Sequence, residues 1–113
     1  MTATRRGEVW QVALDPTQGH EQAGVRPALI LSADLFNASP AGLVSVLPIT
    51  AKARALRTRV EVRPPEGGLS KVSYVICEQT RTLSTHRLTK RLGAVGPATM
   101  ASVEGIVRVL LGL

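Results

Sequence analysis

The feature that most constrains the fold of this chain is a series of short apolar segments separated by glycine- and proline-containing breaks. In residues 8–14, Trp10, Val12 and Leu14 recur at every second position, which is typical of a half-buried β-strand. Residues 57–63 alternate in the same way, and further extended segments are expected at residues 25–32, which form a short apolar run bounded by turn residues, and at 43–49, 72–77, 79–83 and 90–95. We therefore expect a small, curled antiparallel sheet.

Helical periodicity is confined to the end of the chain. Gly96-Pro97 is expected to open a helix, because proline is favoured at the first helical position, and Gly112 is expected to end it. The helix carries an apolar stripe made of Met100, Val103, Val107, Leu110 and Leu111. Residues 34–38 are expected to form a short helical turn. Several strands with one terminal helix predict an α+β fold.

The length of 113 residues predicts one domain, spanning 1–113. No apolar run approaches the roughly 20 residues that a bilayer-spanning helix needs, so we expect no membrane association. The first residues lack the apolar core of a signal peptide, and the single cysteine, Cys77, cannot form an internal disulfide. We therefore expect a cytoplasmic protein.

The charge balance favours a nucleic-acid partner. The 14 basic residues exceed the 8 acidic ones and leave a net charge of +6. Eleven of the basic residues are arginines, whose planar guanidinium matches pairs of phosphate oxygens. Two basic stretches indicate a track for RNA: Lys52, Arg54, Arg57, Arg59 and Arg63, and then Arg81, Arg87, Lys90 and Arg91. Aromatic stacking platforms are scarce, so base recognition is expected to rely on hydrogen bonds.

Familiar motifs for metal, cofactor or nucleotide binding are absent from the sequence. His20, His86 and Cys77 are too far apart to indicate a zinc site, and the acidic residues do not follow a magnesium or calcium pattern. We expect no cofactor and no metal. Candidate functional residues instead occupy a polar loop and three strand ends: His20, Glu21 and Gln22; Arg26; Thr50; and Glu78, Gln79 and Arg81.

Six ordered sequence blocks give the chain a specific resemblance. The blocks are Arg6-Gly7-Glu8-Val9-Trp10, Asp15-Pro16-Thr17, Gly19-His20-Glu21-Gln22, Arg26-Pro27-Ala28-Leu29-Ile30-Leu31, Leu47-Pro48-Ile49-Thr50 and Cys77-Glu78-Gln79-Thr80-Arg81-Thr82. In order and spacing they are similar to the MazF/PemK family of growth-inhibiting toxin endoribonucleases. The resemblance implies an SH3-like barrel or sheet with a C-terminal helix, a homodimer, cleavage of single-stranded RNA, and a MazE-like antitoxin partner.

By the matching blocks, the resemblance implies that Arg26, Thr50 and Glu21 are catalytic. RNA can be cut without a metal when its own 2′-OH attacks the adjacent phosphorus, provided that a base, an acid and donors to the phosphoryl oxygens are present. Arg26 and Thr50 suit the donor role, and Glu21 is favoured as the base, with His20 as an alternative acid or base. RNA contacts are expected from His20, Gln22, Lys52, Arg54, Glu78, Gln79 and Arg81.

Two alternatives from other functional classes stay open at this point. A toxin that acts on a protein target, as the gyrase-directed CcdB does, is expected to share this fold, and fold alone does not determine function. A non-catalytic RNA-binding regulator is favoured by the charge alone. Cleavage of RNA distinguishes the nuclease from both.

Overall fold

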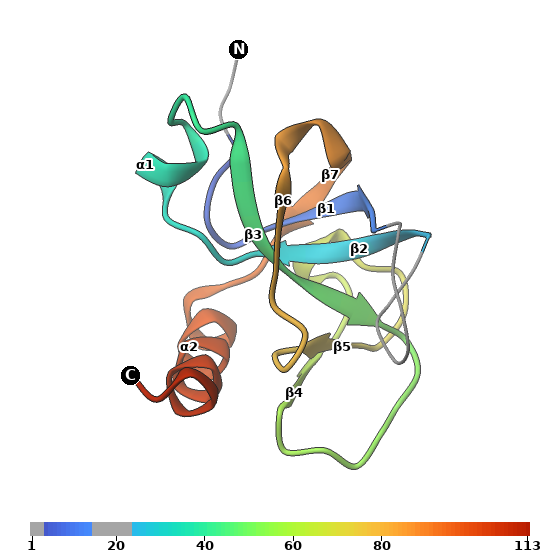
Figure 1. The fold of residues 1–113 in the computed structure, drawn as a ribbon. Coiled ribbons are helices and arrows are strands. Elements are labelled where there is room, and N and C mark those ends of the chain that lie inside the picture. Colours follow the sequence, from blue (N-terminus) through green and yellow to red (C-terminus); the bar gives the residue numbers. More distant parts are fainter. Residues whose placement is uncertain (1–3, 15–23) are drawn as a thin grey trace.

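A curved antiparallel sheet forms the centre of the computed structural model, which describes residues 4–14 and 24–113 (Figure 1). Its seven strands are β1 (Glu8–Ala13), β2 (Val25–Ile30), β3 (Leu43–Thr50), β4 (Arg59–Val62), β5 (Ser73–Ile76), β6 (Arg81–Ser84) and β7 (Leu88–Ala94). The segments predicted at 79–83 and 90–95 thus appear as strands shifted by about two residues. The sequence predicts an extended segment that begins at Gln79. In the structure a turn lies there instead, and the backbone N–H of Gln79 donates to the carbonyl oxygen of Ile76.

The longest strand, β3, organises the sheet. One edge of β3 pairs with β2, while the other edge pairs with β6 along its first half and with β5 along its second half. The main order is β4-β5-β3-β2-β1-β7. No ladder joins β4 to β7 within the described residues, so the sheet curls without closing into a barrel. The predicted curled antiparallel sheet with a C-terminal helix is confirmed.

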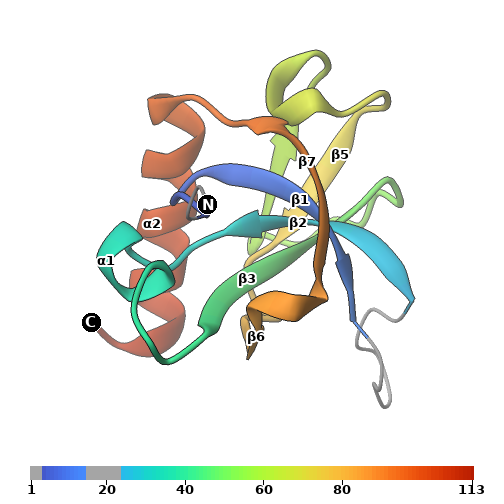
Figure 2. The same ribbon diagram turned by 90° about the horizontal axis from the view of Figure 1, so that it is seen from above.

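Both faces of the central strands are buried, which explains why residues 43–49 read as a nearly continuous apolar run. Val9, Leu29 and Leu47 align across β1, β2 and β3 and pack under the C-terminal helix. The opposite face, which includes Val12, Ala28 and Val46, packs against residues of β6 and β7. Figure 2 shows the helix on one side of the central strands and β6 and β7 on the other.

The C-terminal helix α2 (Pro97–Leu111) begins at the predicted proline. Its start is held by Glu66, whose carboxylate accepts hydrogen bonds from the Gly96 N–H at 2.8 Å and the Thr99 hydroxyl at 2.6 Å. Val103 and Val107 are buried as predicted. No helix in the described part of the chain is long and apolar enough to cross a membrane.

The predicted apolar stripe of α2 is wrong in its last turn. Leu110 and Leu111 are 42% and 59% exposed. The helix axis carries this turn past the core, because Val107 is the last α2 residue in the buried cluster. Periodicity identified the correct helix face but not the length over which a partner surface covers it.

The short elements place the loops at the rim of the sheet. The helix α1 (Asp34–Asn37) confirms the predicted helical turn, and two 3-10 turns, η1 (Glu66–Gly68) and η2 (Thr85–Arg87), precede β5 and β7. Gly68 has a φ of +68°, and a Cβ there would lie 1.9 Å from the carbonyl oxygen of Leu92. The close approach of η1 to β7 fixes where the segment that follows η1 emerges.

Candidate active site

Arg26 and Thr50 lie on the neighbouring strands β2 and β3, each two residues beyond the last pair of the ladder that joins them. The pairs Ala28–Pro48 and Leu29–Leu47 set the register of β2 against β3, and extending that register by two residues places Arg26 across from Thr50. Because side chains of opposed residues lie on the same face of a sheet, both side chains emerge on one side. The ladder ends at Pro48, and Thr50 pairs instead with Tyr74 of β5.

The point where β2 and β3 separate is a hollow. Pro27 and Pro48 lack backbone donors, so neither can extend the ladder with an N–H. A cavity of about 170 Å³ lies there, lined by both Arg26 and Thr50. Its described lining consists of Arg26, Pro27, Ile49, Thr50, Ala51, Leu69, Ser70, Lys71 and Ser73. The hollow combines two cations with hydroxyl groups and contains no carboxylate among these residues, which suits an anionic group such as a phosphate.

A local turn orients the hydroxyl of Thr50. Its Oγ1 accepts a hydrogen bond from the Lys52 backbone N–H at 3.1 Å, and the residue is only 8% exposed. A hydroxyl has one hydrogen and two lone pairs, so this contact uses a lone pair and leaves the hydrogen for donation. The sequence puts the donor at the end of a buried strand, which restricts its motion.

Glu78, one of the predicted RNA contacts, is tied to the loop that follows β3. Its Oε2 lies 2.9 Å from Arg59 Nε and 2.8 Å from Nη2, and its Oε1 accepts from the Thr58 hydroxyl at 2.8 Å. The Arg59 side chain is 5% exposed, and that of Glu78 is 27% exposed. Lys52 and Arg54 lie in this exposed loop. The pair therefore fixes one end of a basic loop that begins beside Thr50.

The environment of this pair changes the pKa values of two neighbouring groups. Partial burial raises the pKa of Glu78, but the hydrogen bonds from Arg59 and Thr58 and the charge of Arg59 together outweigh burial. The pKa of Glu78 is therefore below its ordinary value. Burial raises the pKa of the Cys77 thiol to about 11, and the charge of Glu78 adds to the effect. Glu78 is thus held as a carboxylate, and Cys77 as a neutral thiol.

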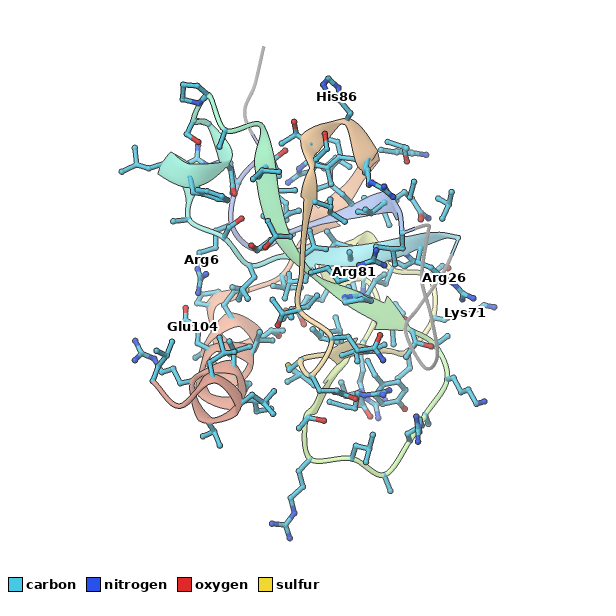
Figure 3. All side chains as sticks on the ribbon, in the orientation of Figure 1. Arg6, Arg26, Lys71, Arg81, His86 and Glu104 are labelled. Atoms are coloured by element: carbon cyan, nitrogen blue, oxygen red, sulfur yellow. The ribbon has the colours of Figure 1, made fainter. Side chains whose placement is uncertain are left out.

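Gln79 and Arg81 follow Glu78 on the path into β6. Gln79 is half-buried. One guanidinium nitrogen of Arg81 donates to the carbonyl oxygen of Leu14 at 2.7 Å, and Arg87 donates to that of Ala13 at 3.3 Å. Both arginines brace the end of β1 where the 15–23 segment departs. Figure 3 shows Arg81 on the central part of the molecule, with Arg26 farther out.

The structure describes only some of the residues that the sequence predicts for the site. His20, Glu21 and Gln22 lie outside the described residues. Lys71, in the loop before β5, and Ser73, the first residue of β5, line the hollow but were not predicted, because a single lysine and a single serine carry no pattern that marks them. Among residues 4–14 and 24–113, no three side chains of histidine, cysteine, aspartate or glutamate are grouped closely enough to hold a metal ion.

Comparison with known proteins finds relatives that match over nearly the whole chain. The chain is 34% identical to endoribonuclease MazF9 of Mycobacterium tuberculosis over 114 residues, covering 96% of this chain and 97% of that protein. It is 36% identical to endoribonuclease MazF of Staphylococcus epidermidis over 110 residues, covering 96% of this chain and 92% of that protein.

Solved structures give the same result. The crystal structure of MazF from Deinococcus radiodurans superposes with a TM-score of 0.87 at 30% identity, covering all of both chains. A MazE-MazF structure from the same organism gives a TM-score of 0.82 at 30% identity, covering 100% of this chain and 99% of that one. A family model for the PemK-like, MazF-like toxin of type II toxin-antitoxin systems matches residues 5–111. Because the family model, these relatives and the fold agree, the chain belongs to the PemK/MazF toxin family.

Proposed function

We propose that this protein is a toxin endoribonuclease that cleaves single-stranded RNA through attack of the substrate's own 2′-OH on the adjacent phosphorus. The products of that reaction are a 2′,3′-cyclic phosphate and a 5′-OH end. The observation that carries the proposal is the hollow shared by Arg26 and Thr50, because it places a cation and an oriented hydroxyl donor around one anion-sized space. The relatives that match over nearly the whole chain are named endoribonucleases.

In this reaction Arg26 and Thr50 stabilise the charge that builds up on the phosphoryl oxygens. Arginine stays protonated at any working pH, so Arg26 acts through its charge and its donors and not as a proton source. Thr50 donates its hydroxyl hydrogen to the same group. A donor fixed in advance is typically worth about 10²–10³ in rate, because its orientation costs nothing at the moment of reaction.

Proton transfer is assigned to the polar loop between β1 and β2. Glu21 takes the 2′-hydroxyl proton in this proposal, and His20 serves as the alternative acid or base. The departing 5′ oxygen must gain a proton, so a second group or a water molecule completes the reaction. Glu78 is the weaker candidate for the base, since its low pKa and its bonds to Arg59 keep the carboxylate engaged.

RNA binding is assigned to the surface around this hollow. Lys52 and Arg54 extend from the exposed loop next to Thr50 and supply charge for flanking phosphates. Gln22 and Gln79 supply amide groups that can read base edges, and His20 and Arg81 complete the predicted contact set. Glu78 contributes by holding the basic loop against the segment that carries Gln79.

The partner assignments follow from the same family. A structure of a related MazF with MazE is known from Deinococcus radiodurans, and we assign a MazE-like antitoxin to this chain. An acidic antitoxin segment would be attracted to the same basic surface as RNA. We also assign a homodimer and a cytoplasmic location, where the RNA substrate is found.

A cleavage assay tests the proposed function. Purified protein is incubated in EDTA with a long single-stranded RNA, next to Arg26→Ala and, as a control, Arg108→Ala. Arg108 is exposed and lines a different hollow together with Arg6 and Glu104. We expect cutting by the wild type and the control, and a loss of about 10²–10³-fold with Arg26→Ala.

The contrary outcomes identify the alternatives. Cutting that requires magnesium, or that is undiminished by Arg26→Ala, contradicts the proposed mechanism. Tight RNA binding without strand scission supports a non-catalytic RNA-binding regulator. Intact RNA together with DNA damage in expressing cells supports a toxin with a gyrase-like protein target.

A further inference from the structure

The hollow is lined by the ends of β2 and β3 and by a third segment that precedes β5, and this segment carries a cation that the proposed chemistry does not use. The segment 69–72, between η1 and β5, and the first residue of β5 contribute lining residues to the cavity that Arg26 and Thr50 share, and Lys71 is one of them. Figure 3 shows Lys71 and Arg26 on the same side of the molecule, away from Arg6 and Glu104. Two positive side chains from segments far apart in the sequence therefore meet at one opening.

The backbone of Lys71 is fixed even though its side chain is exposed. The Ser73 hydroxyl donates a hydrogen bond to the Lys71 carbonyl oxygen at 2.9 Å, and Ser73 is only 5% exposed. Leu69, on the other side of the bend, is buried in the main core at 8% exposure. Both flanks of the bend are thus anchored, and the lysine is carried on a rigid support.

No carboxylate of the described part of the chain forms an ion pair with Lys71, in contrast to Arg59 and Arg91. An ammonium that is positioned by core residues but has no acidic partner there is suited to a ligand anion. Lysine acts as a compact point charge, whereas the planar fork of an arginine suits paired oxygens. One arginine and one lysine at the same opening suit a strand of RNA, because such a strand presents one phosphate after another.

We propose that Lys71 binds the phosphate next to the scissile one, and so holds the RNA strand across the hollow while Arg26 and Thr50 act on the reacting phosphate. This inference rests on the proposed function and adds a positioning residue to it. A contact with a phosphate that does not react is equally strong in the ground state and in the transition state. Its loss therefore raises KM and leaves kcat unchanged.

The test compares Lys71→Gln, Lys71→Arg and Arg108→Gln with the wild type on a short RNA that carries one mapped cut site. Lys71→Gln and Arg108→Gln each remove one positive charge, but Arg108 lines a separate hollow with Arg6 and Glu104. We expect Lys71→Gln to raise KM about fivefold, the factor for one unit-charge contact at about 4 Å in water. Lys71→Arg and Arg108→Gln should stay close to the wild type in KM.

Salt dependence provides a readout that a purely structural role does not change. Each phosphate contact on a single strand adds about 0.7 to the slope of log affinity against log salt, so Lys71→Gln should lower that slope by about 0.7. The slope is measured by fluorescence anisotropy with the same RNA, carrying a 2′-deoxy residue at the cut site to prevent cleavage. An unchanged slope, an equal effect of Arg108→Gln, or a loss confined to kcat overturns the proposal.

Different results contradict the proposed function and the role of Lys71. If the wild type binds RNA but does not cut any long single-stranded RNA, the proposed function is wrong. The anisotropy slopes measured on one of those uncut RNAs then still decide whether Lys71 contacts a phosphate. If the wild type cuts and the slope of Lys71→Gln equals that of the wild type, only the inference about Lys71 is wrong.

Discussion

Replacing Thr50 by valine separates the catalytic contribution of its hydroxyl from its structural one. Valine has nearly the same shape as threonine and keeps the β-branched side chain at the end of β3. The lost group is the hydroxyl, whose oxygen accepts one hydrogen bond, from the Lys52 N–H at 3.1 Å. Lys52 is exposed, so water can replace this acceptor. The free energy of unfolding should therefore fall by only about 0.5–1.5 kcal/mol.

The effect on catalysis should be much larger. If the Thr50 hydroxyl donates to the phosphoryl oxygen in the transition state, its removal lowers kcat by about 10²–10³-fold, or roughly 3–4 kcal/mol. The assay measures initial rates on an RNA with one mapped cut site, together with urea unfolding of each variant. We expect kcat to fall while KM stays within about twofold, because the donor acts mainly on charge that develops during the reaction.

Thr50→Ser is the matched control, because it keeps the hydroxyl and removes only the methyl group. It should retain most of the activity, although it is a less rigid strand residue. Two results would refute the reasoning. One is a Thr50→Val variant that is folded and within tenfold of wild-type kcat. The other is a Thr50→Ser variant that is as inactive as Thr50→Val.

Two further predictions concern stability. Gly68→Ala should destabilise the protein by on the order of 3 kcal/mol, because φ is +68° and the new Cβ would lie 1.9 Å from the Leu92 carbonyl oxygen. Gly105→Ala should instead stabilise the protein, because Gly105 lies on α2 with open space around it and alanine is the better helix former. Thermal unfolding of both variants checks these two expectations. Glu78→Gln should cost about 1–2 kcal/mol at pH 7, since it removes the charge paired with Arg59. The folded-state pKa of Glu78 is lowered, so its stabilising effect exists above the unfolded pKa of about 4.3 and is lost as the pH falls through the folded pKa. Urea unfolding should show the variant approaching the wild type in strongly acidic solution, and a difference that does not change with pH would contradict the assignment.

The parts of the fold that the sequence predicted are those encoded locally. Trp10, Val12 and Leu14 recur at every second position, and the side-chain period of a strand is enough to assign them to one face. Pro97 marks the start of α2 because proline is compatible with the first turn of a helix but not with its interior. These signals do not depend on which other segment packs against them.

The parts that the sequence did not predict depend on contacts between distant segments. The exposure of Leu110 and Leu111 reflects where the core under α2 ends, which helix periodicity does not encode. The open edge of the sheet depends on how β3 divides its pairing between β5 and β6. Whether β4 and β7 meet is therefore set by tertiary packing.

The candidate site shows the same division. Arg26 and Thr50 were found through the resemblance of their sequence blocks, but their placement across from each other requires the register of β2 on β3. Lys71 lines the hollow from a bend that follows η1, which packs closely on β7, and that the Ser73 hydroxyl fixes by a hydrogen bond. The pairing of Glu78 with Arg59 likewise depends on the register of β4 on β5.

In the proposed reaction the nucleophile is the substrate's own 2′-hydroxyl, and one substitution in the RNA tests this. A mapped target is synthesised with a single 2′-deoxyribose on the 5′ side of the cut, and is incubated with the protein in EDTA next to the all-ribose RNA. We predict that the all-ribose RNA yields a 2′,3′-cyclic phosphate and a 5′-OH, while the deoxy-substituted RNA stays intact at that position. Cutting at the deoxy position, with a 5′-phosphate on the product, would contradict the account.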